Sequence, residues 1–205
     1  MKILAVSDNR QPQFLNSEFL KQHYGHVEIL ISCGDMDPDY LDFIASILSL
    51  PLYYVKGNHD HQYTSETPGG IDLHMRTAEY KGVVMAGLQG SIRYNKGDLQ
   101  YSEFEMTSRV LRMLPGLLAR RMAKGYGVDI FAAHSPPRHI NDGKDYAHRG
   151  FRAFRWLIRW GQPRYLIHGH VDLYDQRAPR EAQFLKTSVV NINPSRVITI
   201  EDEAV

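Results

Sequence analysis

The sequence has a single cysteine and no long apolar run, and these two absences exclude whole classes of protein. Cys33 has no second thiol with which to form an internal disulfide, which argues against a disulfide-stabilised secreted domain and fits a reducing compartment. No stretch approaches the roughly 20 apolar residues that a membrane-spanning helix needs. The apolar start, residues 1–6, is too short for a signal-peptide core. We therefore expect a cytoplasmic protein without a membrane partner.

The chain also lacks a dominant charge of one sign, internal repeats and low-complexity tracts. Its 24 basic and 23 acidic residues leave a formal net charge of +1, which gives no overall reason to bind nucleic acid or an anionic membrane. A length of 205 residues with 43% hydrophobic side chains suits one sizeable core. We predict a single domain over residues 1–205 and have no sequence signal for an oligomeric state.

Short aliphatic or β-branched runs recur along the chain, and polar residues follow each of them. They predict strands at 3–6, 27–31, 52–55, 83–86, 128–132 and 165–167. Helical patterns that open with a proline lie between the first three runs, at 12–24 and 38–48. This alternation predicts parallel strands with helices on their faces. Without helices between them, later runs predict an antiparallel portion at 174–178, 184–186, 188–192 and 197–200.

A further helix is predicted at 101–124, where Ser102 and Glu105 have the spacing of a capping box and apolar residues recur at helical intervals. Pro115 and Gly116 fall in the middle of this stretch. Proline removes a backbone donor and glycine has low helix propensity, so we expect a kink or two separate helices. The longest irregular stretch is 58–72, and its polar part, 63–70, would suit a loop over a site.

Carboxylate, amide and imidazole side chains stand just beyond the predicted strands, where open α/β sheets bind their ligands. Each one alone has a structural explanation, since aspartate often caps helices and Gly-Asp or Asn-His sequences are common in turns. Together, in this order and all at strand ends, they are hard to explain as caps. The residues are Asp8, Asp35, the run Gly57-Asn58-His59-Asp60, His134 and His170.

This pattern resembles the calcineurin-like metallophosphoesterases, which show D-x-H, GD, GNHD, a lone histidine and GHxH in the same order. The matching residues are Asp8-Asn9-Arg10, Gly34-Asp35, Gly57-Asn58-His59-Asp60, His134 and Gly169-His170-Val171-Asp172. The resemblance extends from residue 2 to about residue 195. It implies an α/β fold of two facing mixed sheets flanked by helices, in four layers, and a metal-dependent hydrolase of phosphomonoesters or phosphodiesters acting on a small molecule.

One half of the metal site implied by the resemblance is intact and the other half is altered. The intact half would be held by Asp35, Asn58, His134 and His170. In the other half, which Asp8 and Asp35 would share, Arg10 and Asp172 stand where the family has histidines. A guanidinium group offers only donors and cannot bind a metal. We expect Arg10 to pair with Asp172 or Asp8 and to replace one ion, so that one ion is favoured over two.

The alternative keeps two ions, with Asp8, Asp35 and Asp172 as an oxygen-rich ligand set. Manganese is the expected metal, and iron, zinc, nickel and magnesium are the other candidates. A bound ion would activate water to a hydroxide for attack on phosphorus. Arg10 could bind a phosphoryl oxygen by donating hydrogen bonds to it.

Two further side chains complete the predicted mechanism. His59 would protonate the leaving oxygen as general acid. Asp60 would either orient the His59 imidazole or stabilise its turn, and the sequence leaves these two roles open. Asn58 and His148 are predicted to contact the substrate, His148 because it resembles a family position near the substrate.

A basic helix face is predicted within 149–160, where Arg152, Arg155 and Arg159 recur beside Trp156 and Trp160. A solvated helix face is the favoured explanation. Binding of a nucleic acid through phosphates and stacked bases is the less favoured one. The alternatives to a small-molecule phosphoesterase are therefore a nuclease and a non-catalytic interaction module on the same fold.

Overall fold

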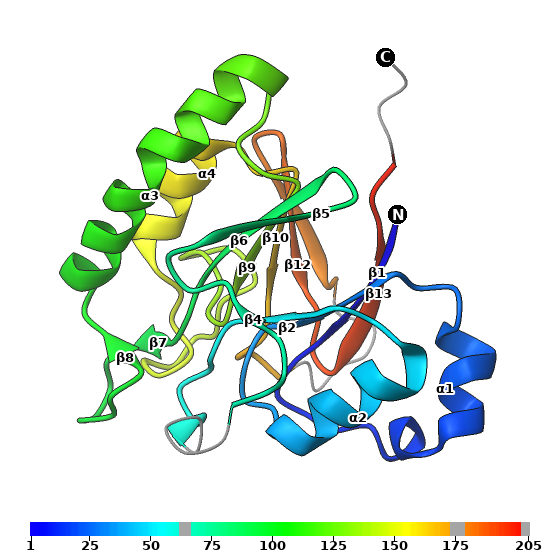
Figure 1. The fold of residues 1–205 in the computed structure, drawn as a ribbon. Helices are drawn as coiled ribbons and strands as arrows, with labels where there is room; N and C mark the ends of the chain where they lie inside the picture. Colours follow the sequence, from blue (N-terminus) through cyan, green and yellow to red (C-terminus); the bar gives the residue numbers. More distant parts are fainter. Residues whose placement is uncertain (62–66, 173–178, 202–205) are drawn as a thin grey trace.

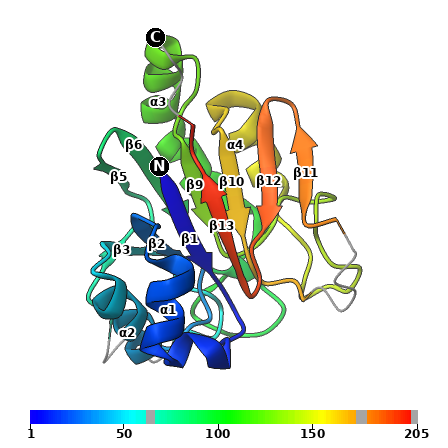
Figure 2. The same ribbon diagram turned by 90° about the vertical axis from the view of Figure 1, so that its right-hand side faces the viewer.

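Two β-sheets face each other and carry helices on their outer faces (Figures 1 and 2). The computed structural model describes residues 1–61, 67–172 and 179–201. Sheet A has the strand order β13-β1-β2-β3-β4, and sheet B has the order β11-β12-β10-β9-β6-β5. Both sheets mix parallel and antiparallel neighbours, so the predicted α/β class with two mixed sheets flanked by helices is confirmed.

Sheet A is built from the first third of the chain and one returning strand. Its parallel strands are β1 (Lys2–Val6), β2 (Ile29–Ser32), β3 (Leu52–Tyr54) and β4 (Ile71–Asp72), and β13 (Ser195–Thr199) runs antiparallel beside β1. The outer face carries η1 (Pro12–Leu15), α1 (Ser17–Tyr24) and α2 (Pro38–Leu48). The helix predicted at 12–24 is divided at Asn16, whose side chain accepts hydrogen bonds from the N–H groups of Glu18 and Phe19 and so caps α1.

Sheet B contains four parallel strands between two antiparallel edges. The strands are β5 (Thr77–Tyr80), β6 (Val83–Leu88), β9 (Ile130–Ala133), β10 (Tyr165–His168), β11 (Glu181–Phe184) and β12 (Thr187–Asn191). Its outer face carries α3 (Glu103–Lys124) and α4 (Arg152–Gly161). β12 is antiparallel to β11 but parallel to β10, so only part of the predicted antiparallel portion has that pairing. The strand predicted at 174–178 lies outside the described residues.

Two short strands, β7 (Ser91–Ile92) and β8 (Gln100–Tyr101), form a separate parallel pair. The sequence analysis did not predict this pair, and it also missed β4 and β5. Each of these elements is short or only half-buried, so none of them produces a long apolar run.

Both faces of the central strands are buried, which explains why they read as continuous apolar runs. In β1, Ile3 and Ala5 face sheet B, whereas Leu4 packs on the outer side among residues of α1 and α2. In β9, Ile130 lies between the sheets and Phe131 packs against α3 and α4. The alternation gives four layers: helices, sheet A, sheet B and helices.

The helix α3 runs without a break from Glu103 to Lys124, so the predicted division into two helices at Pro115 is wrong. Pro115 and Gly116 lie on the exposed side, where water can bond the carbonyl group that proline leaves without a partner. Leu114 and Leu117 on either side are buried in the core and hold both halves in line. No helix of the described residues, α3 included, is both long and apolar enough to cross a membrane.

Two glycines of α3 allow a matched test of this account. A Cβ added at Gly116 or at Gly125 would meet open space, but Gly125 has a φ of +85° and ends the helix in the left-handed region. We predict that Gly116→Ala raises the free energy of unfolding by about 0.5–1 kcal/mol, since alanine favours the helix. Gly125→Ala should lower it by about 1–2 kcal/mol, since the left-handed region is costly for a residue with a Cβ.

Urea unfolding followed by circular dichroism measures both variants. If Gly116→Ala were as destabilising as Gly125→Ala, α3 would not be continuous through Pro115 in solution.

Candidate metal centre

The predicted site residues meet at one rim of the two sheets, where the parallel strands end. Asp8 follows β1, Asp35 follows β2 and Asn58 follows β3, all in sheet A. His134 follows β9 and His170 follows β10, both in sheet B. Residues from two sheets therefore converge because the carboxyl ends of their parallel strands share an edge.

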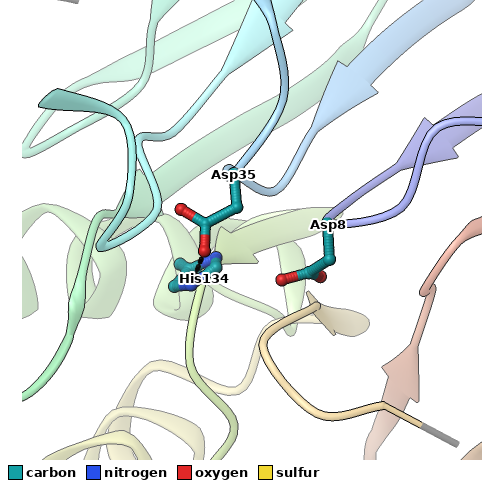
Figure 3. A group of neighbouring side chains, drawn as sticks. All are labelled: Asp8, Asp35 and His134. Carbon is teal, nitrogen blue, oxygen red and sulfur yellow. Dashed lines mark ion pairs between the residues drawn. The ribbon is translucent and has the colours of Figure 1, made fainter. Parts of the chain in front are cut away.

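Asp8, Asp35 and His134 bring one ligand atom each to within 4.8 Å of one another. Figure 3 shows the Asp35 carboxylate directed at the His134 ring, with the Asp8 carboxylate beside it. The Nε2 atom of His134 lies 3.4 Å from Asp35 Oδ2 and 2.9 Å from Asn58 Oδ1. The His170 ring is 4.8 Å from the His134 ring, centroid to centroid. The structure thus brings Asp35, Asn58 and His134 of the predicted ligand set together. The His170 ring lies beside them, but its Nε2 atom is 2.9 Å from the carbonyl oxygen of Ala147.

His134 is held in an orientation that suits a metal ligand. Its ring is fully buried, and its Nδ1 atom lies 2.8 Å from the carbonyl oxygen of Cys33. A carbonyl only accepts, so Nδ1 donates and Nε2 is turned toward Asp35 and Asn58. Burial lowers the pKa of His134, but the carboxylates of Asp35 and Asp8 outweigh burial and raise that pKa to about 9. This cluster of acceptors around one nitrogen fits a divalent cation.

The backbone at the metal centre is held in an uncommon conformation. Asp8, Asp35 and His170 have φ values of 62°, 55° and 65°, in the left-handed region that most residues avoid. Hydrogen bonds hold the two carboxylates in these turns: Asp35 Oδ1 accepts from the His59 N–H at 2.7 Å, and Asp8 Oδ2 accepts from the His170 N–H at 2.9 Å. Burial would raise the pKa of Asp35, but His134 and the His59 N–H hold it at about 2.

Asp60 stabilises the turn that carries Asn58 and His59. Its Oδ2 atom accepts hydrogen bonds from the backbone N–H groups of Asp35 at 2.8 Å and Gly57 at 2.7 Å. Burial raises the pKa of Asp60 to about 6. Among the described residues no contact joins its carboxylate to the His59 ring. Of the two roles predicted for Asp60, the contacts match the turn-stabilising one.

Arg10 is turned away from the metal ligands. Its Nη2 atom lies 2.8 Å from Asp37 Oδ2, and its guanidinium group lies 5.9 Å from the centre of the Tyr40 ring. The side chain is 58% exposed. The predicted pairing of Arg10 with Asp8 or Asp172 is therefore wrong. Asp37 is the N-cap of α2, and the sequence analysis did not consider it as a partner.

Asp172 takes part in a network of amides instead. Its Oδ1 atom accepts from Asn9 Nδ2 and from Asn193 Nδ2, each at 2.8 Å. Asn9 Nδ2 also donates to Asn193 Oδ1 at 3.0 Å. The sequence analysis assigned no role to either asparagine, although both stand in stretches that resemble the family. Their positions after β1 and β12 were the available signal.

A pocket of about 440 Å³ opens over the ligands. His59 and His148 line it, together with Asn9, Tyr94 and Asp172. The hydroxyl group of Tyr94 bonds the Asn58 Nδ2 group at 3.2 Å, a contact for which the sequence contains no signal.

Asp145, which the sequence analysis also missed, orients His148. The Nδ1 atom of His148 lies 2.9 Å from the Asp145 carboxylate, and this hydrogen bond lowers the pKa of Asp145. The two residues are three positions apart in the sequence, so this contact is local. Because Nδ1 is engaged, the other ring nitrogen of His148 remains for a ligand in the pocket.

Comparisons with known proteins agree with this geometry. A family model described as the calcineurin-like phosphoesterase superfamily domain matches residues 1–193. Among curated proteins no match is found. The crystal structure of TT1561 of Thermus thermophilus shares 19% identity with a TM-score of 0.60, covering 93% of this chain and 88% of that chain. GAP50, the anchor in the inner membrane complex of Plasmodium, shares 14% identity with a TM-score of 0.51, covering 93% and 70%. At these identities both likenesses show the fold alone.

Gly169 leaves room for the Asp8 carboxylate, which gives a test of the site that spares every ligand. A Cβ at position 169 would overlap Ser7 Oγ and Asp8 Oδ2. We predict that Gly169→Ala displaces Asp8 and weakens manganese binding about 10- to 100-fold, the usual effect of disturbing a ligand's support. Isothermal titration calorimetry measures the affinity. Gly116→Ala, where a Cβ meets open space, is the control and should bind manganese normally. Equal manganese affinities in Gly169→Ala and Gly116→Ala would show that Asp8 does not contribute to metal binding.

Proposed function

This chain belongs to the calcineurin-like phosphoesterase superfamily, and on that premise we propose that it is a metal-dependent hydrolase of phosphate esters. The observation that carries the proposal is the approach of the Asp8, Asp35 and His134 ligand atoms to within 4.8 Å of one another. Carboxylate, amide and imidazole ligands together suit manganese, and also iron, zinc, nickel or magnesium. The substrate would be a small phosphomonoester or phosphodiester that enters the pocket of about 440 Å³.

The proposal favours one ion rather than two. Asp35, Asn58, His134 and His170 would hold that ion, with Asp8 at its side. Support comes from the altered half of the site, where Asp172 Oδ1 already accepts two amide hydrogen bonds. Arg10 does not serve as a substitute cation in this proposal, since its partner is Asp37.

The bound ion would polarise a phosphoryl oxygen and lower the pKa of the attacking water. Protein side chains would protonate the leaving oxygen and bind the phosphoryl group. His59 is exposed at the pocket wall while Asp35 holds its backbone N–H, so its ring can reach a leaving oxygen and protonate it. His148, oriented by Asp145, would bind a phosphoryl oxygen through its free ring nitrogen. Tyr94 keeps the Asn58 amide in place.

The metal content follows from the one-ion proposal. Protein dialysed against manganese and then freed of excess metal should contain about one ion per chain by plasma mass spectrometry. Asp35→Asn should lose most of that ion, since it removes a charged ligand that lies against His134. Asp39→Asn, which changes an exposed carboxylate in the first turn of α2, should retain it. Close to two ions per chain would reject the one-ion proposal.

His59→Asn tests the general acid and the proposed function together. Manganese-dependent hydrolysis of bis-p-nitrophenyl phosphate by the unchanged protein is the first measurement. For a phosphate ester with an alkyl leaving group, His59→Asn should lower kcat about 10²- to 10⁴-fold while its manganese content stays the same. The loss should be smaller with p-nitrophenyl esters, because p-nitrophenolate leaves without a proton.

His26→Asn is the matched control, because His26 is exposed and distant in sequence from the site. No hydrolysis of any ester with any of the candidate metals would favour a non-catalytic interaction module instead. Equal losses for both leaving groups would remove His59 as the proton donor.

A further inference from the structure

A second pocket, of about 510 Å³, lies beside α4 and contains none of the metal-centre residues. It is bounded by α4, by the loop that carries Arg138 and by Phe184 of β11. What distinguishes it is its composition, since arginines and tryptophans make up most of its wall. They are Arg138, Arg152, Arg155, Arg159, Trp156 and Trp160.

The positive charge in this pocket is largely uncompensated. Arg138 forms an ion pair with Asp142 at 2.8 Å. Within the described ranges, Arg152, Arg155 and Arg159 have no carboxylate within ion-pair distance. Arg155 donates to the carbonyl of Arg138 at 3.3 Å and lies over the Phe184 ring, so it adds no neutralising contact. Like charges gathered on one face of a chain with a net charge of +1 favour an anionic ligand.

The two tryptophans are not needed for the core of the protein. Phe154, Leu157 and Ile158 form the buried side of α4. Trp156 and Trp160, one helical turn apart, remain 51% and 52% exposed. Large flat rings presented to solvent between arginines can stack on planar groups of a ligand.

A third, smaller pocket adjoins the second one and is lined in part by sequence neighbours of metal-pocket residues. This pocket, of about 180 Å³, shares Arg138 and Arg152 with the second pocket and is also lined by Tyr146, Arg149 and Glu103. The Glu103 carboxylate accepts hydrogen bonds from the backbone N–H groups of Arg152 and Ala153. The next residues along the chain, Ala147 and His148, line the metal pocket. Arginines and aromatic rings, with the Glu103 carboxylate among them, therefore line a path of neighbouring pockets from α4 to the segment that enters the metal pocket.

We propose that this path binds a single strand of nucleic acid, with phosphates at the arginines and bases stacked on Trp156 and Trp160. A polyanion with regularly spaced planar groups fits the arginines and the exposed aromatic rings that line the path. The inference rests on the proposed function in one respect: the strand, in place of a small molecule, would present a phosphodiester to the metal centre. The sequence alone favoured a solvated helix face. The pocket reverses that preference, because three of its arginines have no ion pair with any described residue.

Intrinsic fluorescence offers a direct measurement, because Trp156 and Trp160 are the two tryptophans of the chain. Titration of the full-length protein with a 12-nucleotide oligodeoxythymidylate, in EDTA and low salt, should quench tryptophan fluorescence. The affinity should fall as sodium chloride rises, with a log–log slope of about −0.7 for each phosphate contact. Thymidine monophosphate should bind at least 10-fold more weakly than the oligonucleotide.

Variants locate the binding surface by anisotropy of a labelled oligonucleotide. Trp156→Ala and Trp160→Ala should each weaken binding about 5- to 100-fold, the usual range for loss of one stacked base. Arg152→Ala and Arg159→Ala should each reduce the salt slope by about 0.7. Phe104→Ala and Arg112→Ala, which change an exposed aromatic and an exposed arginine of α3, are the matched controls and should bind like the unchanged protein.

Three results would overturn the inference: no quenching by the oligonucleotide, equal losses in the controls, or mononucleotide binding as tight as oligonucleotide binding. The last would indicate a nucleotide site instead. Because EDTA removes metal from the assay, binding can succeed when ester hydrolysis fails, and hydrolysis of bis-p-nitrophenyl phosphate can succeed when binding fails. The two proposals are therefore tested separately.

Discussion

His134 joins the two sheets at the point where the site forms, and the other ligands depend on this contact. It follows β9 of sheet B, yet its ring nitrogens bond Cys33 and Asn58, which follow strands of sheet A. An imidazole can reach across only because the inner core holds the sheets face to face. A fully buried ring without such partners would be costly. The packing that holds the two sheets together therefore also sets the geometry of the metal centre.

The sequence was sufficient to predict which ligands come together, but not which partner every side chain contacts. Asp8, Asp35 and His134 could be grouped because apolar runs mark the strands, and parallel strands end at a common edge. The contacts of Arg10 and Asp60 depend on which neighbour offers a better partner within a few ångströms. The N-cap carboxylate of Asp37 and two backbone N–H groups were those partners. The spacing of residues in the sequence does not indicate which of these partners a side chain contacts.

Helix boundaries show the same division between local signals and tertiary packing. Asn16 interrupts a helical pattern because its side chain can bond two free N–H groups, which is a local effect that the residue type allows. Pro115 fails to interrupt α3 because buried leucines on both sides hold the helix on sheet B. A proline at a buried position would have had to leave a carbonyl group without water. Pro115 is exposed, as the flanking apolar pattern implied, and this exposure allows α3 to continue through it.

Acidic and basic side chains gather in different pockets of this nearly neutral chain. In our proposals, the acidic pocket binds the metal and the basic pocket binds the substrate. The pocket at the metal centre contains Asp8, Asp35 and Asp172, which would repel a phosphate strand. In our proposal, the arginines beside α4 would attract the same strand and hold it close to that pocket. A divalent ion held by Asp8 and Asp35 would offset this repulsion. Binding of the strand to the arginines would therefore need no metal, whereas entry of a phosphodiester into the metal pocket would need one.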